Sequence, residues 1–202
     1  MVKLTIIESN AAIERKIKKA LSKQVSDRLS KAANRVLNAV SPVIASALWS
    51  SQEIASLSSG TLRAEFGLTF DPSSQIVGAI MDSLEIDIRQ VDSNLNGGFT
   101  LTMQPSSFSN LLSLPIAEQP IEKGGSIPWL EWLLKAGDSV VVADFGVEFG
   151  PHGRTGKARM ARGKSSPYKV NSSFSGTADN NFITRAIDRA YPKIQEIIRR
   201  AL

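Results

Sequence analysis

Cysteine is absent from this 202-residue chain, and histidine occurs only once, at His152. Without cysteine there is no disulfide framework and no thiolate metal site. A zinc site built around a single histidine would need three Asp or Glu partners. We therefore expect no metal site and no cofactor.

The chain also has no long apolar run. A membrane-spanning helix needs roughly 18 consecutive apolar residues, and no stretch of this sequence approaches that length. The apolar stretch before Glu8 is too short for a signal peptide. These absences predict a soluble, intracellular protein that does not contact a membrane.

Acidic residues are missing between Glu148 and Asp179. We call residues 150–177 the basic arm, because they carry six cations and no acid: Arg154, Lys157, Arg159, Arg162, Lys164 and Lys169. Long loops without secondary structure are uncommon inside compact domains and are often functional. The pattern therefore predicts an extended basic loop with a binding role.

Charge is segregated along the rest of the chain as well. Residues 14–35 hold eight Lys or Arg and two Asp or Glu, whereas residues 36–149 hold four Lys or Arg and 13 Asp or Glu. Such a chain can bind a polyanion, or it can bind copies of itself, basic segment against acidic segment. A third interpretation is that the basic segments are simply solvated faces.

Hydrophobic periodicity predicts helices in the first third of the chain. Asn10 can cap a helix that runs to about Val40. Ser41 and Pro42 then fit the N-cap and the first position of a second helix. That helix would end before Gly60, which fits a C-cap glycine.

Alternating apolar and polar residues predict strands over 62–70, 84–89, 99–104 and 141–149. The turn Asn96-Gly97-Gly98 joins the second and third of these into a hairpin. Residues 105–128 are expected to form an irregular loop, followed by a short helix in WLEWLLKAG and a last helix from about Thr177. Helices, then an antiparallel sheet, then a helix make an α+β fold, expected as a single domain over residues 1–202.

The segment GPHGRTGKA invites comparison with a phosphate-binding P-loop, but it departs from that motif. Gly150 and Gly156 are separated by five residues instead of four, and Ala158 stands where a Mg²⁺-binding hydroxyl is needed. The residues that follow are not expected to open a helix, so the helix N-terminus that would hold phosphate is missing.

Other catalytic patterns are equally weak. Glu85 and Asp87 fall on one face of a predicted strand, where a solvated sheet face is the simpler interpretation. His152 is not accompanied by a G-x-S-x-G nucleophile motif. We therefore expect no catalytic residues and no enzymatic activity.

Two further features leave alternatives open. Trp129 and Trp132 lie in a short helix that is apolar on nearly every side, so they belong either to the core or to an interface. The basic arm could contact nucleic-acid phosphates without reading sequence. It carries only Tyr168 and Phe174 as stacking groups, and the chain shows no named nucleic-acid-binding motif.

The C-terminal third carries a characteristic succession of segments: IPWLEWLLKAGDSVVV, then GRTGKARM, YKV and FSGTADNNFITRAI. Together with SLSSGTLRAEFGL nearer the front, this pattern resembles the neck, head–tail connector and tail-completion proteins of contractile-tailed bacteriophages. The resemblance covers roughly residues 30–202 and is most specific from Gly153 to Ile187.

The resemblance implies a structural virion protein. It implies a homo-oligomeric ring, a hexamer or dodecamer, at the junction of head and tail, with packaged double-stranded DNA passing through its centre. Neighbouring neck, portal or tail proteins would be its other partners, and the host cytoplasm its location during assembly. We further expect the basic arm to order on a neighbouring subunit, with its six cations as charge contacts and Phe174 as an apolar anchor. The alternative is a nucleic-acid-binding protein that uses the same loop.

Overall fold

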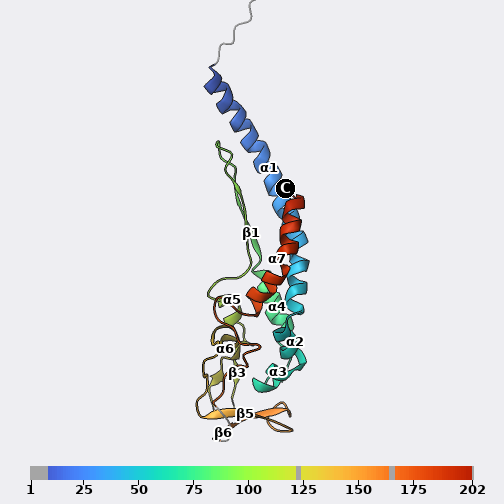
Figure 1. Cartoon of the computed structure of the whole chain (residues 1–202), viewed down its shortest axis with the longest axis vertical. Helices are drawn as coiled ribbons and strands as arrows, with labels where there is room; N and C mark the ends of the chain where they lie inside the picture. Colours follow the sequence, from blue (N-terminus) through green and yellow to red (C-terminus); the bar gives the residue numbers. More distant parts are fainter. Residues whose placement is uncertain (1–8, 122–123, 164–166, 202) are drawn as a thin grey trace, which may run out of the picture. The chain divides into compact units, whose positions relative to one another are not determined.

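The computed structural model describes residues 9–121, 124–163 and 167–201. These residues form helices, including a long N-terminal and a C-terminal helix, and small antiparallel hairpins, which confirms the α+β class (Figure 1). They divide into two compact units. The helix–hairpin unit comprises Met1–Val40, Glu85–Thr102 and Gln195–Leu202, and the core unit comprises Ser41–Leu84 and Met103–Ile194. The sequence also suggests a short strand over residues 2–7, and these lie outside the described residues.

The helix–hairpin unit contains the first part of α1 (Asn10–Trp49), with β1 (Glu85–Arg89) and β2 (Gly98–Thr102). The two strands pair antiparallel, with Asp87 opposite Thr100, as the sequence predicted. Alternation leaves Glu85 and Asp87 exposed and puts Ile86 and Ile88 in half-buried positions. The amide N of Val91 donates to Ser26 Oγ at 2.9 Å, which ties the hairpin to α1.

The predicted break between two helices at Ser41 and Pro42 is wrong. Helix α1 continues through Pro42 to Trp49, and the next helix, α2 (Gln52–Ser59), begins eleven residues after the predicted cap. Ser51 is the N-cap, because its Oγ accepts from the amide N of Ile54 at 3.4 Å. Gly60 is the C-cap, as predicted.

The predicted strand over residues 62–70 is also wrong. Its first part is the helix α3 (Thr61–Glu65), which Gly67 ends with a φ of +67°, and α4 (Ser73–Asp82) follows. The alternating apolar residues are nevertheless buried except for the exposed Phe70, because helix and turn together direct them inward: Leu62, Ala64, Phe66 and Leu68.

The segment 105–128 is less irregular than expected. It contains α5 (Ser109–Leu112) and the short strands β3 (Gln119–Pro120) and β4 (Ser126–Ile127), which pair antiparallel. Helix α6 (Trp129–Lys135) confirms the short helix predicted after it.

Helix α7 (Phe182–Ala201) begins five residues later than the predicted start near Thr177. The buried Asn181 caps it, because its Oδ1 accepts from the amide N of Ile183 at 3.0 Å. Arg185, one turn into the helix, forms an ion pair with Glu53 at 2.7 Å, and the Glu53 side chain is only 6% exposed. This pair ties α7 to α2 inside the core unit.

The basic arm does not lack secondary structure throughout. Its residues Ala158–Arg162 form β6, which pairs antiparallel with β5 (Phe145–Phe149) from Phe145 opposite Arg162 to Phe149 opposite Ala158. The strand predicted over 141–149 therefore begins only at Phe145, and Val142 makes an isolated bridge to Tyr168. The residues after the GRTG turn are not expected to open a helix, and the described ones, Ala158–Arg162, form a strand.

Candidate interaction surface

The β5–β6 hairpin is shaped by glycines in its turn. The amide N of Gly150 donates to the Lys157 carbonyl at 2.8 Å, and that of Gly156 to the Gly153 carbonyl at 3.2 Å. Gly153 has a φ of +71°, and a Cβ atom there would lie 2.1 Å from the Ala158 carbonyl oxygen. The GRTG segment is thus a tight hairpin turn, and the requirement for glycine follows from the close approach of the two strands.

The hairpin presents an apolar face. The register puts Phe145, Val147 and Phe149 on one side, together with Ala158 and Met160. Phe145 is 37% exposed and Phe149 57% exposed. Exposed aromatic side chains next to arginines are the composition that is enriched at the centres of protein–protein interfaces.

The six predicted cations of the arm have different surroundings. Arg159 forms an ion pair with Glu148 across the hairpin, at 3.1 Å. Arg154 donates from Nη1 to the Pro120 carbonyl at 2.7 Å. The side chains of Lys157, Arg162 and Lys169 are exposed and make no ion pair or hydrogen bond with the residues that the structure describes, and Lys164 lies outside those residues.

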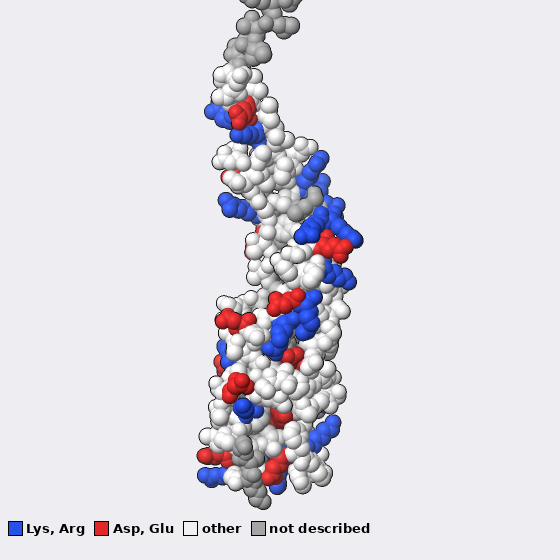
Figure 2. All heavy atoms as spheres, viewed as in Figure 1, with Lys and Arg blue, Asp and Glu red and all other residues white. Residues whose placement is uncertain are grey.

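The core unit shows no continuous basic patch on the face drawn in Figure 2. On the face shown in Figure 2, Lys and Arg atoms alternate with Asp and Glu atoms over the lower part, which is the core unit. The two basic segments also differ, because the α1 segment is largely exposed along one helix whereas the arm is folded into a hairpin.

Of the aromatic residues predicted as anchors, one is buried in the core unit and two are half-buried there. Trp129 is fully buried and its Nε1 donates to the Ile116 carbonyl at 2.7 Å, so the core interpretation holds for this residue. Trp132 is half-buried, with its ring centroid 6.3 Å from that of Tyr168. Phe174 is half-buried in a turn, and its carbonyl accepts from Arg185 Nη2.

Tyr168 anchors the arm to α3. Its hydroxyl donates to Glu65 Oε2 at 3.2 Å. Burial raises the pKa of the Glu65 carboxyl, and the hydrogen bond from Tyr168 opposes that rise. Burial, with the neighbouring Glu65 carboxylate, also raises the pKa of Tyr168, so the phenol keeps its proton and remains the donor. This contact fixes the end of the arm beyond the hairpin.

A cleft lies between α3 and the hairpin turn. It has a volume of about 240 Å³, and three cations and no acidic residue line it. We call it the basic cleft and define it by its lining: Gly60, Arg63, Ala64, Leu68, Thr69, Arg154, Thr155 and Lys157. Arg63 is fixed by three carbonyls, since its guanidinium donates to those of Ser58, Leu68 and Thr69 at 2.7, 3.3 and 3.0 Å.

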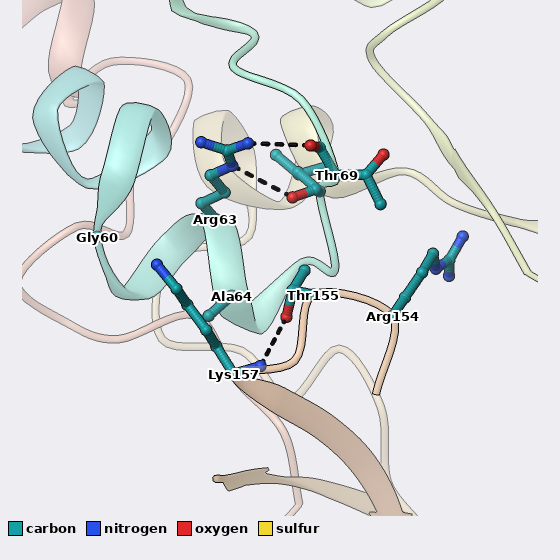
Figure 3. A pocket seen from close by; sticks show the side chains of 8 residues that line it. Gly60, Arg63, Ala64, Thr69, Arg154, Thr155 and Lys157 are labelled. Carbon is teal, nitrogen blue, oxygen red and sulfur yellow. Dashed lines mark hydrogen bonds between the residues drawn. The ribbon is translucent and has the colours of Figure 1, made fainter. Parts of the chain in front are cut away.

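The three cations do not converge on one point. Figure 3 shows Lys157 extending along α3 toward the side of Gly60, Arg63 directed at the segment with Thr69, and Arg154 on the far side of Thr155. The Thr155 hydroxyl, which accepts from the amide N of Lys157 at 3.3 Å, lies between them. The arrangement suits an extended anionic segment better than a single small ion.

The other candidate catalytic residues have no neighbours among the described residues that would support catalysis. His152 is exposed, and Glu85 and Asp87 lie on the exposed face of β1. Among the described residues, no three His, Cys, Asp or Glu side chains are grouped so that they could hold a metal ion. The helices that these residues form do not combine the length and hydropathy of a membrane-spanning segment.

Comparison of the chain with protein-family models, with curated proteins and with solved structures found no match. The functional argument therefore rests on the residues and their geometry.

Sequence reasoning missed three residues of this surface. Phe145 and Phe149 looked like ordinary strand residues, because alternation cannot tell a face that packs on the core from one that stays exposed. Arg63 was placed on a strand, so its position opposite the hairpin turn could not be foreseen. A signal for Arg63 was present: it is the only cation between Arg35 and Arg89.

Proposed function

We propose that the chain is a structural virion protein that forms a homo-oligomeric ring at the head–tail junction of a tailed bacteriophage, in the neck or tail-completion layer. The observation that carries the proposal is the β5–β6 hairpin, which exposes Phe145 and Phe149 beside cationic side chains. The resemblance to tail-completion and neck proteins is most specific from Gly153 to Ile187, a range that includes part of the hairpin turn and β6.

The charge distribution supports a ring of identical copies. A heterologous interface joins two different patches of one chain and closes into a ring when the rotation permits. The excess of acid over residues 36–149 and of base over 14–35 and 150–177 gives every copy segments of opposite charge. DNA would pass through the centre of the ring, and portal or tail proteins would contact its two sides.

The experiment measures the mass of the purified chain by analytical ultracentrifugation at low and high salt, with negative-stain imaging of the same samples. We expect one discrete oligomer that images as a ring and weakens as salt screens the charges. A chain that stays monomeric at every concentration and salt tested would contradict self-assembly.

A second candidate is a nucleic-acid-binding protein that does not read sequence. The observation that favours it is the first part of α1, where Arg15, Lys16, Lys18, Lys19 and Lys23 are concentrated over three turns of an exposed helix. It predicts DNA affinity that falls steeply with salt, because each neutralised phosphate releases counterions. Fluorescence anisotropy with duplexes of unrelated sequence distinguishes it: tight binding by a monomer favours this candidate, whereas a ring without such affinity favours assembly.

A further inference from the structure

The basic cleft contains more positive charge than its own unit neutralises. Arg63 is held in place by carbonyl oxygens, which orient the guanidinium without cancelling its charge. Arg154 is likewise bonded only to a carbonyl oxygen, and the Lys157 side chain makes no hydrogen bond or ion pair with the described residues. The Asp71 carboxylate interacts electrostatically with Arg63 but does not line the cleft. The three cations therefore have no carboxylate within the recess, and they form a site for an anionic group.

The shape of the cleft argues for a side-chain carboxylate. Arg63 is half-buried and its guanidinium is held against the backbone at the wall of the recess. A DNA duplex presents its phosphates on a convex surface and most readily contacts protruding cations, whereas a Glu or Asp side chain can extend into a recess. The spread of the three cations further favours two carboxylates on one strand (Figure 3).

The same chain carries such a pair. Glu85 and Asp87, which we call the acidic pair, are exposed on one face of β1. They lie two residues apart along a strand, which separates them by roughly 7 Å. Pairing with β2 holds that spacing, with Thr102 and Thr100 opposite them. Neither carboxylate forms an ion pair or hydrogen bond with other described residues.

We propose that the basic cleft of one copy receives the acidic pair of a second copy. The inference rests on the proposed ring and names one of its contacts. Because the cleft and the pair are different surfaces of one chain, the contact is heterologous and repeats around a ring. Arg154 and Lys157 meet the two carboxylates, and the fixed Arg63 and the Thr155 hydroxyl line the recess between them.

Charge reversal tests the contact on the full chain. One variant carries Arg154→Glu and Lys157→Glu, and a second carries Glu85→Lys and Asp87→Lys. Arg63 is left unchanged because its bonds to three carbonyls make it part of the fold. Each variant alone brings like charges together, which should raise the dissociation constant between copies about a hundredfold.

The decisive sample is an equal mixture of the two variants. Each contact in an alternating ring then pairs opposite charges again, so the mixture should recover the oligomer that each variant has lost. Matched controls reverse exposed charges outside the cleft, the basic arm and the acidic pair: Lys193→Glu with Arg199→Glu, and Asp179→Lys with Asp188→Lys. We expect both controls to assemble like the wild type, and circular dichroism and thermal unfolding check that every variant folds.

The outcomes separate this inference from the proposed function. If the wild type forms no oligomer, both are wrong. If the wild type assembles and the reversed variants assemble equally well, the ring stands and this contact is wrong. If each variant loses assembly and the mixture does not recover it, the cleft does not bind the acidic pair. If the cleft variant keeps assembly but loses DNA affinity, the cleft is a nucleic-acid site and the inference is overturned.

Discussion

Gly153 occupies the tightest point of the β5–β6 turn. Its Cβ position lies 2.1 Å from the Ala158 carbonyl oxygen, so any side chain would force the two strands apart. Gly156 has a similar φ, +66° against +71°, but a Cβ there would meet open space. Replacing each glycine by alanine therefore separates the free-energy cost of a left-handed backbone from the cost of a steric overlap.

We expect Gly156→Ala to lower the free energy of unfolding by about 1 kcal/mol, the usual cost of a left-handed conformation for a residue with a side chain. Gly153→Ala should cost clearly more, because the overlap with Ala158 is added. Chemical denaturation of both variants measures the difference. Equal losses would show that the turn relaxes freely and that the close approach is not a constraint.

The residue scale also shows what single side chains reveal from sequence. The absence of acidic residues identifies the six cations of the arm as a group, but the surroundings of each cation depend on residues far along the chain. Glu148 pairs with Arg159 only through the strand register, and Pro120 meets Arg154 only through tertiary packing. The sequence composition shows where the charged residues lie along the chain, whereas their interaction partners depend on the fold.

At the scale of elements, helix α2 shows how a strong local signal can mislead. Ser41-Pro42 fits a helix start, yet α1 continues through it, because Pro42 costs the helix one backbone hydrogen bond while the apolar residues on either side remain buried: Val40, Ile44 and Leu48. The next helix starts instead after Ser51, whose third following residue is Ile54 and not the Glu or Gln of a capping box, so the local signal there is weaker.

We predict that Ser51→Ala lowers the free energy of unfolding by about 1 kcal/mol, the typical cost of losing an N-cap. Ser51 is 1% exposed, so water cannot readily replace its oxygen as the acceptor for Ile54. The adjacent Ser50→Ala is the control, because that exposed serine donates only to the Ala47 carbonyl. Similar losses for the two variants would mean that Ser51 does not act as the cap.

The elements that were predicted correctly share a physical cause. The β1–β2 hairpin combines strict alternation with an Asn-Gly turn, and α6 combines a dense apolar run with a flanking proline, so local and tertiary preferences agree. Residues 62–70 alternate as clearly, yet they form a helix and a turn. The same apolar residues can be buried by a strand, or by a five-residue helix followed by a turn at the left-handed Gly67. The local sequence does not distinguish these two structures.

At the scale of the whole molecule, burial is distributed unevenly between the two units. The buried apolar side chains of the described helix–hairpin unit are Ala32, Ala33, Val36 and Val40, and the remaining core belongs to the other unit. Toward the N-terminus of α1, Ile17 is 53% exposed, Leu21 40% and Val25 42%. An apolar stripe left this open is typical of a surface that a partner covers.

Hydrogen exchange should reveal this asymmetry in the unassembled chain. Helices owe most of their stability to tertiary packing, so amides of α1 between Glu14 and Val25 should exchange by local opening. Amides of the same helix from Ile44 to Leu48, beside two fully buried side chains, should exchange near the rate of global unfolding. Mass spectrometry of peptides from the two ends of α1 measures both in one sample.

In the assembled ring, protection of the N-terminal part should rise while that of residues 44–48 changes little. Equal protection of both ends in the monomer would mean that the exposed stripe is stable without a partner, and it would remove the reason to place an assembly contact there.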